Sequence, residues 1–176
     1  MNAIQLVGIG RTEKKLLSEL CADLASLFRV PCAVLPQPLN PEFAFNPERQ
    51  QFHSTAILAR LAQSAPNDGT AVLGVADVDL YIPILMFVFG EAQVARPCAV
   101  ISCRRLRQEF YGLPPDAALL RQRLCKEAAH ELGHTMGLRH CDDYQCAMAP
   151  SHSVDWMDLK LERYCDACAA QVAARV

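Results

Sequence analysis

The sequence predicts an α/β fold, with a small, twisted, mostly parallel β-sheet covered by two helices and a longer third helix. Three observations support this prediction. Short apolar runs alternate with segments of helical periodicity, a long helical segment ends in a histidine-rich motif, and closely spaced cysteines follow that motif. The chain of 176 residues has the length of one domain. We therefore expect one domain over residues 1–176, with an N-terminal subdomain over 1–140 and a C-terminal subdomain over 141–176.

The first elements follow from local patterns. Residues 4–9 are apolar and partly β-branched, so we expect a strand there. Thr12 is expected to cap a helix that runs to about Arg29, because leucines recur in it at helical spacing. Residues 32–35 predict a short second strand, and the prolines and asparagines of residues 36–47 predict a loop.

The middle of the chain predicts a second helix over residues 48–63, in which His53 is expected to be a surface residue. Residues 71–75 predict a buried strand. Asp77 and Asp79 follow at its carboxyl end, where they could bind a cation or simply end the strand. We favour the second interpretation, because no third oxygen ligand is in register.

Residues 85–91 and 98–103 predict two further strands, one of them at an edge of the sheet. Pro114 and Pro115 then interrupt the chain, and Asp116 is expected to cap a helix that ends near Leu138. Its buried face is predicted by apolar residues at helical spacing, namely Leu120, Leu124, Ala128 and Leu132. Glu127, one turn before the histidine motif, could support the metal ligands from behind or lie at the surface, and we favour the surface.

The histidine motif lies at the end of this helix. His130, Glu131, His134, Gly137 and His140 form the pattern H-E-x-x-H-x-x-G-x-x-H, an extended zinc-hydrolase motif. Residues four apart on a helix share a face, so His130 and His134 can bind one metal ion. Gly137 can adopt positive φ and return the chain so that His140 becomes the third ligand. Three imidazoles leave one position open for water, and Glu131 is the natural general base.

Four cysteines follow directly after the third histidine. Cys141 and Cys146 form one pair and Cys165 and Cys168 form another, which is the spacing of a tetrahedral, all-thiolate zinc site. Disulfides are the alternative. We favour metal, because nine cysteines is an odd number and nothing in the sequence indicates export.

Composition and charge argue against several classes of protein. The formal net charge is −2 without a basic block, so we expect no nucleic-acid partner. Residues 1–10 lack the pattern of a signal peptide, and the strongly apolar run at 82–89 is too short to span a bilayer. We therefore expect a monomer in the reducing cytoplasm that has no membrane association.

The motif from His130 to Met148, H-E-x-x-H-x-x-G-x-x-H-C-x4-C-x-M, followed by C-x-x-C, resembles the archaemetzincins, a branch of the metzincin zinc peptidases. Residues 74–81 and 87–92 are also similar to that family, so the resemblance covers essentially the whole chain. One difference is visible: 16 residues separate Met148 from Cys165, where the family pattern has about one more. This gap is expected to be a loop, so the deletion should not move the ligands.

The resemblance implies a role for each of these residues. His130, His134 and His140 would bind a catalytic zinc, Glu131 would be the catalytic residue, and Met148 would lie beneath the metal. A second, structural zinc would be bound by four cysteines, namely Cys141, Cys146, Cys165 and Cys168. The resemblance also implies that residues 87–92 form an antiparallel edge strand along which a peptide would bind, although this edge could instead be covered.

Two residues near Met148 could stabilise an oxyanion, namely Tyr144 and His152. The expected function is peptide-bond hydrolysis by a zinc metallopeptidase that acts on peptide or protein substrates. The first alternative is a zinc-dependent peptide-binding or regulatory protein with little or no turnover. A weaker alternative is hydrolysis of a non-peptide amide.

Overall fold

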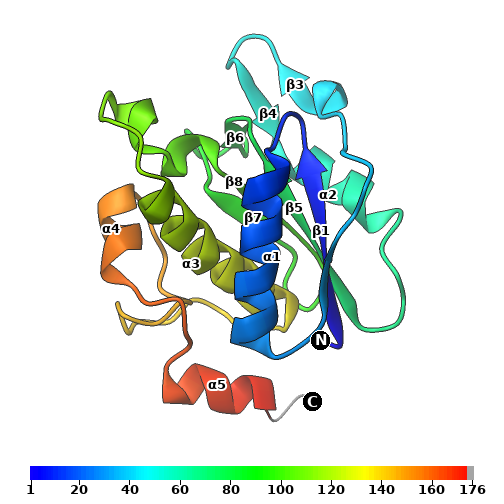
Figure 1. The fold of residues 1–176 in the computed structure, drawn as a ribbon, viewed down its shortest axis with the longest axis vertical. Coiled ribbons are helices and arrows are strands. Elements are labelled where there is room, and N and C mark those ends of the chain that lie inside the picture. The colour runs from blue at the N-terminus through cyan, green and yellow to red at the C-terminus, as the bar shows by residue number, and fades with distance from the viewer. Residues whose placement is uncertain (174–176) are drawn as a thin grey trace.

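The computed structural model describes residues 1–173 and contains a five-stranded main sheet (Figure 1). The order of its strands is β2 (Cys32–Val34), β1 (Ala3–Ile9), β5 (Thr70–Ala76), β8 (Cys98–Ser102) and β7 (Gly90–Ala92). The first four strands are parallel to one another, and β7 runs antiparallel to β8 at the edge. This confirms the predicted mostly parallel sheet with one antiparallel strand.

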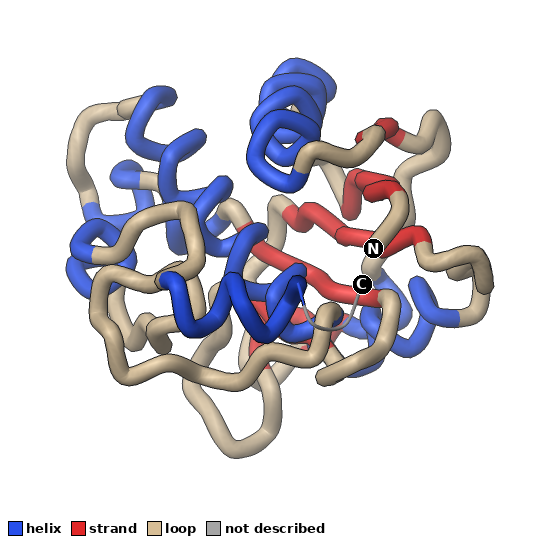
Figure 2. The backbone as a smooth tube through the Cα atoms, turned by 90° about the horizontal axis from the view of Figure 1, so that it is seen from below, coloured by secondary structure: helices blue, strands red, loops and turns tan. Residues whose placement is uncertain are grey.

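Helices cover both faces of the main sheet (Figures 1 and 2). The helices α1 (Lys14–Phe28) and α3 (Ala117–Thr135) pack on one face, and α2 (Ser54–Ala62) packs on the other. Because alternate residues of a strand point to opposite faces, Leu73 and Val75 of β5 join the core beneath α1 and α3, whereas Val72 joins the core beneath α2. Cys98 and Cys103, which are an odd number of residues apart, also lie in different cores.

A second, three-stranded sheet was not predicted. It consists of β3 (Phe45–Asn46), β4 (Gln51–His53) and β6 (Leu80–Tyr81). Strands β3 and β4 pair antiparallel, and β4 pairs with β6 in parallel. These strands are only two or three residues long, so they carry too little alternation to be recognised in the sequence.

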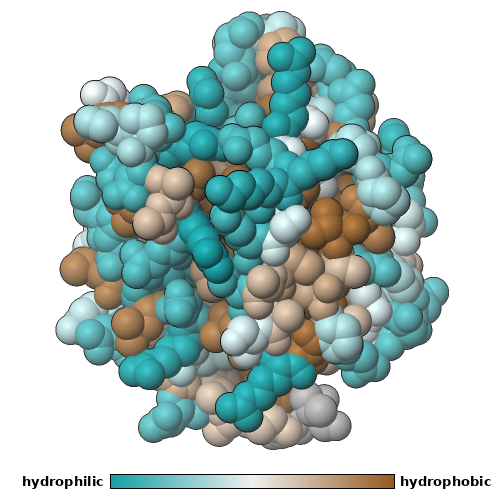
Figure 3. Space-filling view, in the orientation of Figure 1, coloured by the Kyte–Doolittle hydropathy of each residue, from teal (hydrophilic) through white to brown (hydrophobic). Residues whose placement is uncertain are grey.

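The remaining helices are short. Three 3₁₀ helices cover Glu42–Ala44, Arg104–Leu106 and Gln108–Tyr111. Two α-helices follow α3, namely α4 (Val154–Leu159) and α5 (Asp166–Ala173). Among residues 1–173, no helix is both long and apolar enough to cross a lipid bilayer. Figure 3 shows one face of the molecule, on which apolar residues are scattered among a majority of hydrophilic ones.

Three predictions of local structure were wrong. The second helix begins at Ser54, not at residue 48, because residues 51–53 pair with β3 and β6. Residues 85–88 are not part of β7, since a turn at Leu85 follows Pro83 and the edge strand begins only at Gly90. Thr12 does not cap α1, because its hydroxyl lies 2.9 and 2.8 Å from the carbonyl oxygens of Ile9 and Val75.

The long helix was predicted closely. Asp116 caps α3 by accepting a hydrogen bond of 2.9 Å from the backbone N–H of Leu119. The predicted buried positions Leu120, Leu124, Ala128 and Leu132 are all buried against the sheet. The helix ends at Thr135, three residues earlier than expected. The subdomain expected over 141–176 reaches beyond the described residues at its last three positions.

Candidate metal centre and active-site cleft

The three histidines of the motif meet at one point. His130 and His134 project from the same face of α3, and Gly137 has φ of +87°, as its role in reversing the chain requires. His140 follows in the loop, where it lies close to both of the other rings. One ring nitrogen from each histidine lies within 4.8 Å of the others, in an arrangement that could hold a metal ion.

Hydrogen bonds to backbone carbonyls fix the orientation of two of these rings. His130 Nδ1 lies 2.8 Å from the carbonyl oxygen of Ala147, and His134 Nδ1 lies 2.9 Å from that of Leu138. A carbonyl only accepts, so both Nδ1 atoms donate and both Nε2 atoms keep a lone pair. Backbone carbonyl groups, and not carboxylates, therefore orient these two rings.

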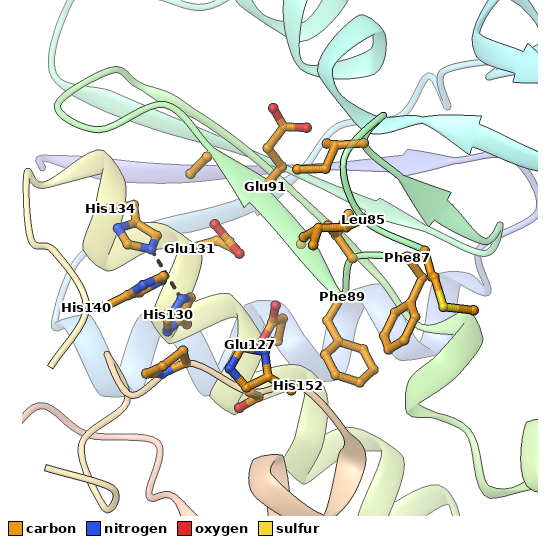
Figure 4. A pocket seen from close by; sticks show the side chains of 17 residues that line it. Leu85, Phe87, Phe89, Glu91, Glu127, His130, Glu131, His134, His140 and His152 are labelled. Atoms are coloured by element: carbon orange, nitrogen blue, oxygen red, sulfur yellow. Dashed lines mark hydrogen bonds between the residues drawn. The ribbon is translucent and has the colours of Figure 1, made fainter. Parts of the chain in front are cut away.

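The two lone pairs face each other across 3.2 Å, the distance between His130 Nε2 and His134 Nε2 (Figure 4). Two lone pairs at this distance repel unless a cation lies between them. Tetrahedral zinc with Zn–N bonds of about 2.0–2.1 Å would separate two ligand nitrogens by about 3.3 Å. The spacing of these two nitrogens therefore fits a zinc ion.

Burial keeps these imidazoles neutral. It lowers the pKa of His130 well below its usual value, and it also lowers the pKa of His134 and of His140. A secondary cause at all three histidines is the positive charge of Lys160. Only a neutral imidazole has a nitrogen lone pair available for a metal, so the environment favours the form that binds one.

Glu131 is buried beside the histidines, and its Oε2 atom has no hydrogen-bond partner. Burial raises the pKa of this carboxyl group well above its usual value, the neighbouring Glu127 raises it further, and Lys160 acts in the opposite direction. A cation bound at the histidines would also favour the ionised form. Gly90 provides the space for this side chain, because a Cβ atom there would lie 2.7 Å from Glu131 Cγ.

Met148 packs directly beneath the histidine-bearing turn of α3. It is fully buried, and a Cβ atom at Gly133 would overlap its sulfur. Gly133 lies between the two helical histidines, so its missing side chain is what allows the methionine to approach. Met148 therefore contacts the helix that carries the metal site, and it is not among the residues that converge as candidate ligands.

The four cysteines that follow the histidines also converge. Their sulfur atoms all lie within 4.8 Å of one another, and Cys141 Sγ is 3.8 Å from Cys165 Sγ. Tetrahedral zinc with Zn–S bonds of about 2.3 Å would separate two sulfurs by about 3.8 Å. Cys146 Sγ accepts hydrogen bonds from the backbone N–H groups of Met148 and Cys165, which fix the position of this sulfur. The four sulfurs thus fit a second zinc ion.

A cleft of about 490 Å³ opens in front of the histidines. One wall is α3 with Glu127, and the opposite wall is formed by residues 85–92 (Figure 4). The strand β7 lies in this second wall, at the edge of the main sheet. It is held by Glu91, whose carboxylate accepts hydrogen bonds from the hydroxyls of Ser54 and Thr55 at the start of α2.

Residues far away in the sequence hold the apolar part of this wall. Arg49 Nη2 donates to the carbonyl oxygens of Leu85 at 2.7 Å and Met86 at 3.1 Å, and Gln51 Nε2 also donates to Met86 at 2.9 Å. Neither Arg49 nor Gln51 was predicted to contact this wall. An arginine and a glutamine in a segment that resembled a helix gave no signal of such a contact.

The other residues singled out in the sequence have different positions relative to the cleft. His152 lines the cleft, whereas Tyr144 is largely exposed and is not among the lining residues. Asp79 accepts two hydrogen bonds from Arg105, so its carboxylate is paired within the protein. The prediction that Glu127 is a surface residue was wrong: it is buried, and its Oε2 lies 3.9 Å from Lys160 Nζ.

Comparisons with known protein families and sequences give consistent results. The model of peptidase family M54 matches residues 4–174. The archaemetzincin of Methanocaldococcus jannaschii is 42% identical over 167 residues, which cover 95% of this chain and 90% of that protein. The archaemetzincin of Thermococcus kodakarensis is 45% identical over 126 residues, which cover 71% of this chain and 68% of that protein.

Solved structures with the same fold span nearly the whole chain. The crystal structure of a zinc-dependent peptidase from Methanocorpusculum labreanum matches with a TM-score of 0.88 and 30% identity, and the match covers 96% of this chain and 99% of that one. The crystal structure of the Archaeoglobus fulgidus archaemetzincin, complexed with malonate, matches with a TM-score of 0.83 and 33% identity over the same shares of the two chains.

Proposed function

The chain belongs to peptidase family M54, and from this premise we propose that it is a zinc metallopeptidase that hydrolyses peptide bonds in peptide or protein substrates. The family match confirms the resemblance to archaemetzincins predicted from the sequence. The observation that carries the proposed activity is local. Three neutral imidazoles converge on one point, and beside them a buried carboxylate oxygen has no partner.

In this proposal His130, His134 and His140 hold the catalytic zinc. The metal supplies Lewis acidity, which polarises a peptide carbonyl and makes water more acidic. The carbonyl oxygens of Ala147 and Leu138 keep the first two rings in the tautomer that leaves Nε2 free. These carbonyls therefore contribute to metal affinity although they do not touch the metal.

Glu131 is the general base of the proposed reaction. Its carboxylate takes a proton from the attacking water and then delivers that proton to the nitrogen of the leaving amine. The missing Cβ atom of Gly90 lets this carboxylate reach the cleft. His152, which lines the cleft, is our candidate for stabilising the negative charge that develops on the carbonyl oxygen.

We propose that the substrate binds in an extended conformation along β7. An edge strand has backbone N–H and C=O groups that can pair with a peptide, and β7 lies in the wall of the cleft. The hydrogen bonds from Ser54 and Thr55 to Glu91 fix the position of this strand. The edge would then bind the peptide chain independently of its sequence.

A second, structural zinc is proposed at Cys141, Cys146, Cys165 and Cys168. Because Cys141 adjoins His140, this ion would fix the backbone that carries the third catalytic ligand. We propose the division into subdomains 1–140 and 141–176 on the same ground, with the boundary between these two neighbours.

The test is digestion of a diverse peptide library, with products identified by mass spectrometry. We expect cleavage by the zinc-loaded native protein and none by a Glu131→Ala variant with the same zinc content. Chelation should abolish cleavage, and added zinc should restore it. Equal peptide binding by both forms without cleavage by either would refute the enzyme and favour the alternative, a zinc-dependent peptide-binding protein.

A further inference from the structure

Two buried side-chain polar atoms have no hydrogen-bond partner among residues 1–173. One is Oε2 of Glu131, the proposed general base, and the other is Oγ of Ser151. Both residues line the cleft in front of the histidines. Buried polar groups normally have partners, because an unpaired one costs free energy. Two such atoms in the same cleft indicate groups that find their partners only when the cleft is occupied.

Ser151 lies in the connection between Met148 and α4. The backbone of this connection is held in place near the serine. Lys160 Nζ donates a hydrogen bond of 3.2 Å to the carbonyl oxygen of Ala149, and the ring of Pro150 restricts the next residue to φ near −65°. The position of Ser151 is therefore constrained by its neighbours, whereas no hydrogen bond constrains its hydroxyl.

The Ser151 hydroxyl can turn without losing an interaction. A serine side chain has three staggered rotamers about a single bond, and a change between them breaks no hydrogen bond here, because the hydroxyl makes none. In its present rotamer the oxygen is shielded from solvent. After a turn towards the cleft, one donor and two lone pairs would be available to a bound group.

The proposed substrate has polar groups that β7 would leave unpaired. An extended peptide has backbone N–H and C=O groups along both of its edges, and pairing with β7 would use only one edge. Ser151 and its neighbour His152 line the cleft away from β7, since Figure 4 shows Glu91 of β7 and His152 on opposite sides of the opening. A backbone group on the second edge of the peptide is therefore a suitable partner for the Ser151 hydroxyl.

We propose that Ser151 is a substrate-binding residue, whose hydroxyl turns into the cleft and forms a hydrogen bond with the backbone of the bound peptide on the edge that faces away from β7. This inference rests on the proposed function, in which an extended peptide lies along β7. The peptide is then held from two sides beside Glu131. Because the bond is made to the backbone, Ser151 contributes to affinity for many peptide sequences and not to selection among them.

Removal of the hydroxyl should not destabilise the free protein. Ser151→Ala takes away a buried group that lacks a partner, so the melting temperature of the zinc-loaded protein should rise by about 2–4 °C. Ser102→Ala is the matched control, because Ser102 is also buried but lies outside the cleft, and its Oγ donates a hydrogen bond of 2.6 Å to the carbonyl oxygen of Val78. The control should melt about 2–4 °C lower than the native protein.

Peptide affinity should change in the opposite sense. It is measured by calorimetric titration of the zinc-loaded Glu131→Ala protein with a library peptide that this protein binds, so that no cleavage interferes. Addition of Ser151→Ala should raise Kd about tenfold, the effect of one lost hydrogen bond, whereas addition of Ser102→Ala should change Kd less than about twofold. With Glu131 intact, Ser151→Ala should lower kcat/KM by a similar factor of about ten.

A crystal structure of the Glu131→Ala protein with the same peptide tests the contact itself. Ser151 Oγ should lie within about 3.2 Å of a nitrogen or oxygen atom of the peptide backbone. A hydroxyl that binds only a water molecule in this complex would overturn the inference.

Two further results would also overturn it. One is a lower melting temperature or a failure to fold in Ser151→Ala, which would show that the hydroxyl supports the fold. The other is an unchanged Kd. If the native protein binds peptides but cleaves none, the proposed activity fails, while the titration and the crystal structure still decide the role of Ser151. If it cleaves peptides and Ser151→Ala binds them as tightly as before, only this inference fails.

Discussion

Removal of one cysteine from the four-cysteine cluster should weaken zinc binding at the histidines. Cys146→Ala deletes a sulfur that accepts two backbone hydrogen bonds, one of them from the N–H of Met148. Ala147 lies between Cys146 and Met148, and its carbonyl oxygen fixes the ring of His130 through a contact of 2.8 Å to Nδ1. Cys141 also donates its backbone N–H to the carbonyl oxygen of Met148 at 3.0 Å. One deletion therefore loosens the segment that orients a metal-binding ring.

The size of the effect follows from that ring contact. Loss of a hydrogen bond that orients a metal ligand typically weakens metal affinity about 10- to 100-fold. This corresponds to about 1.4–2.7 kcal/mol of binding free energy. We expect a loss in this range at the histidine site, together with loss of the ion at the cysteines.

The assay is competition for zinc with a chelator of known affinity, followed by elemental analysis of the protein. Cys98→Ala is a matched control, because it also removes a buried thiol but lies in the core beneath α2. Native affinity at the histidines in Cys146→Ala would refute the coupling between the two sites. An equal loss in Cys98→Ala would show that the effect is general destabilisation.

Three further results are expected. Gly133→Ala should lower the free energy of unfolding in urea by about 1 kcal/mol, because overlap with the Met148 sulfur costs about 2 kcal/mol and helix propensity returns about 1. An unchanged or higher stability would contradict this. Arg49→Met should raise KM about fivefold with kcat nearly unchanged, since two partly exposed hydrogen bonds to the cleft wall are worth about 1 kcal/mol. Unaltered steady-state kinetics would count against this prediction. Leu124→Ala should lower the free energy of unfolding by about 2–5 kcal/mol, whereas the exposed control Leu113→Ala should lower it by less than about 0.5 kcal/mol. Similar losses of stability in the two variants would contradict this prediction.

The parts of the fold that were predicted correctly have strong local patterns. The strand before α1 is mostly apolar, and α3 has leucines at helical spacing after an aspartate cap. The candidate metal-binding residues could also be located, because fixed spacings on a helix or around a tight turn dictate which side chains meet. Gly137 is an example, since its φ of +87° is what the return of His140 requires.

The parts that were missed depend on contacts between distant segments. Glu127 was expected at the surface because a charged side chain is usually solvated, and the partner that pairs with it in the interior, Lys160, lies 33 residues later. The three short strands of the second sheet are formed by pairing across the chain and not by local alternation. Likewise, the wall at Leu85 is shaped by Arg49, which local periodicity cannot reveal.

The most direct test of the central claim is anomalous X-ray scattering from crystals of the native protein at the zinc absorption edge. Our account predicts two peaks in each molecule. One should be bonded to the Nε2 atoms of His130 and His134 together with His140, and the other should lie among the four cysteine sulfurs. Crystals grown with zinc that show no peak at the histidines, or in which their ring nitrogens point apart, would contradict it.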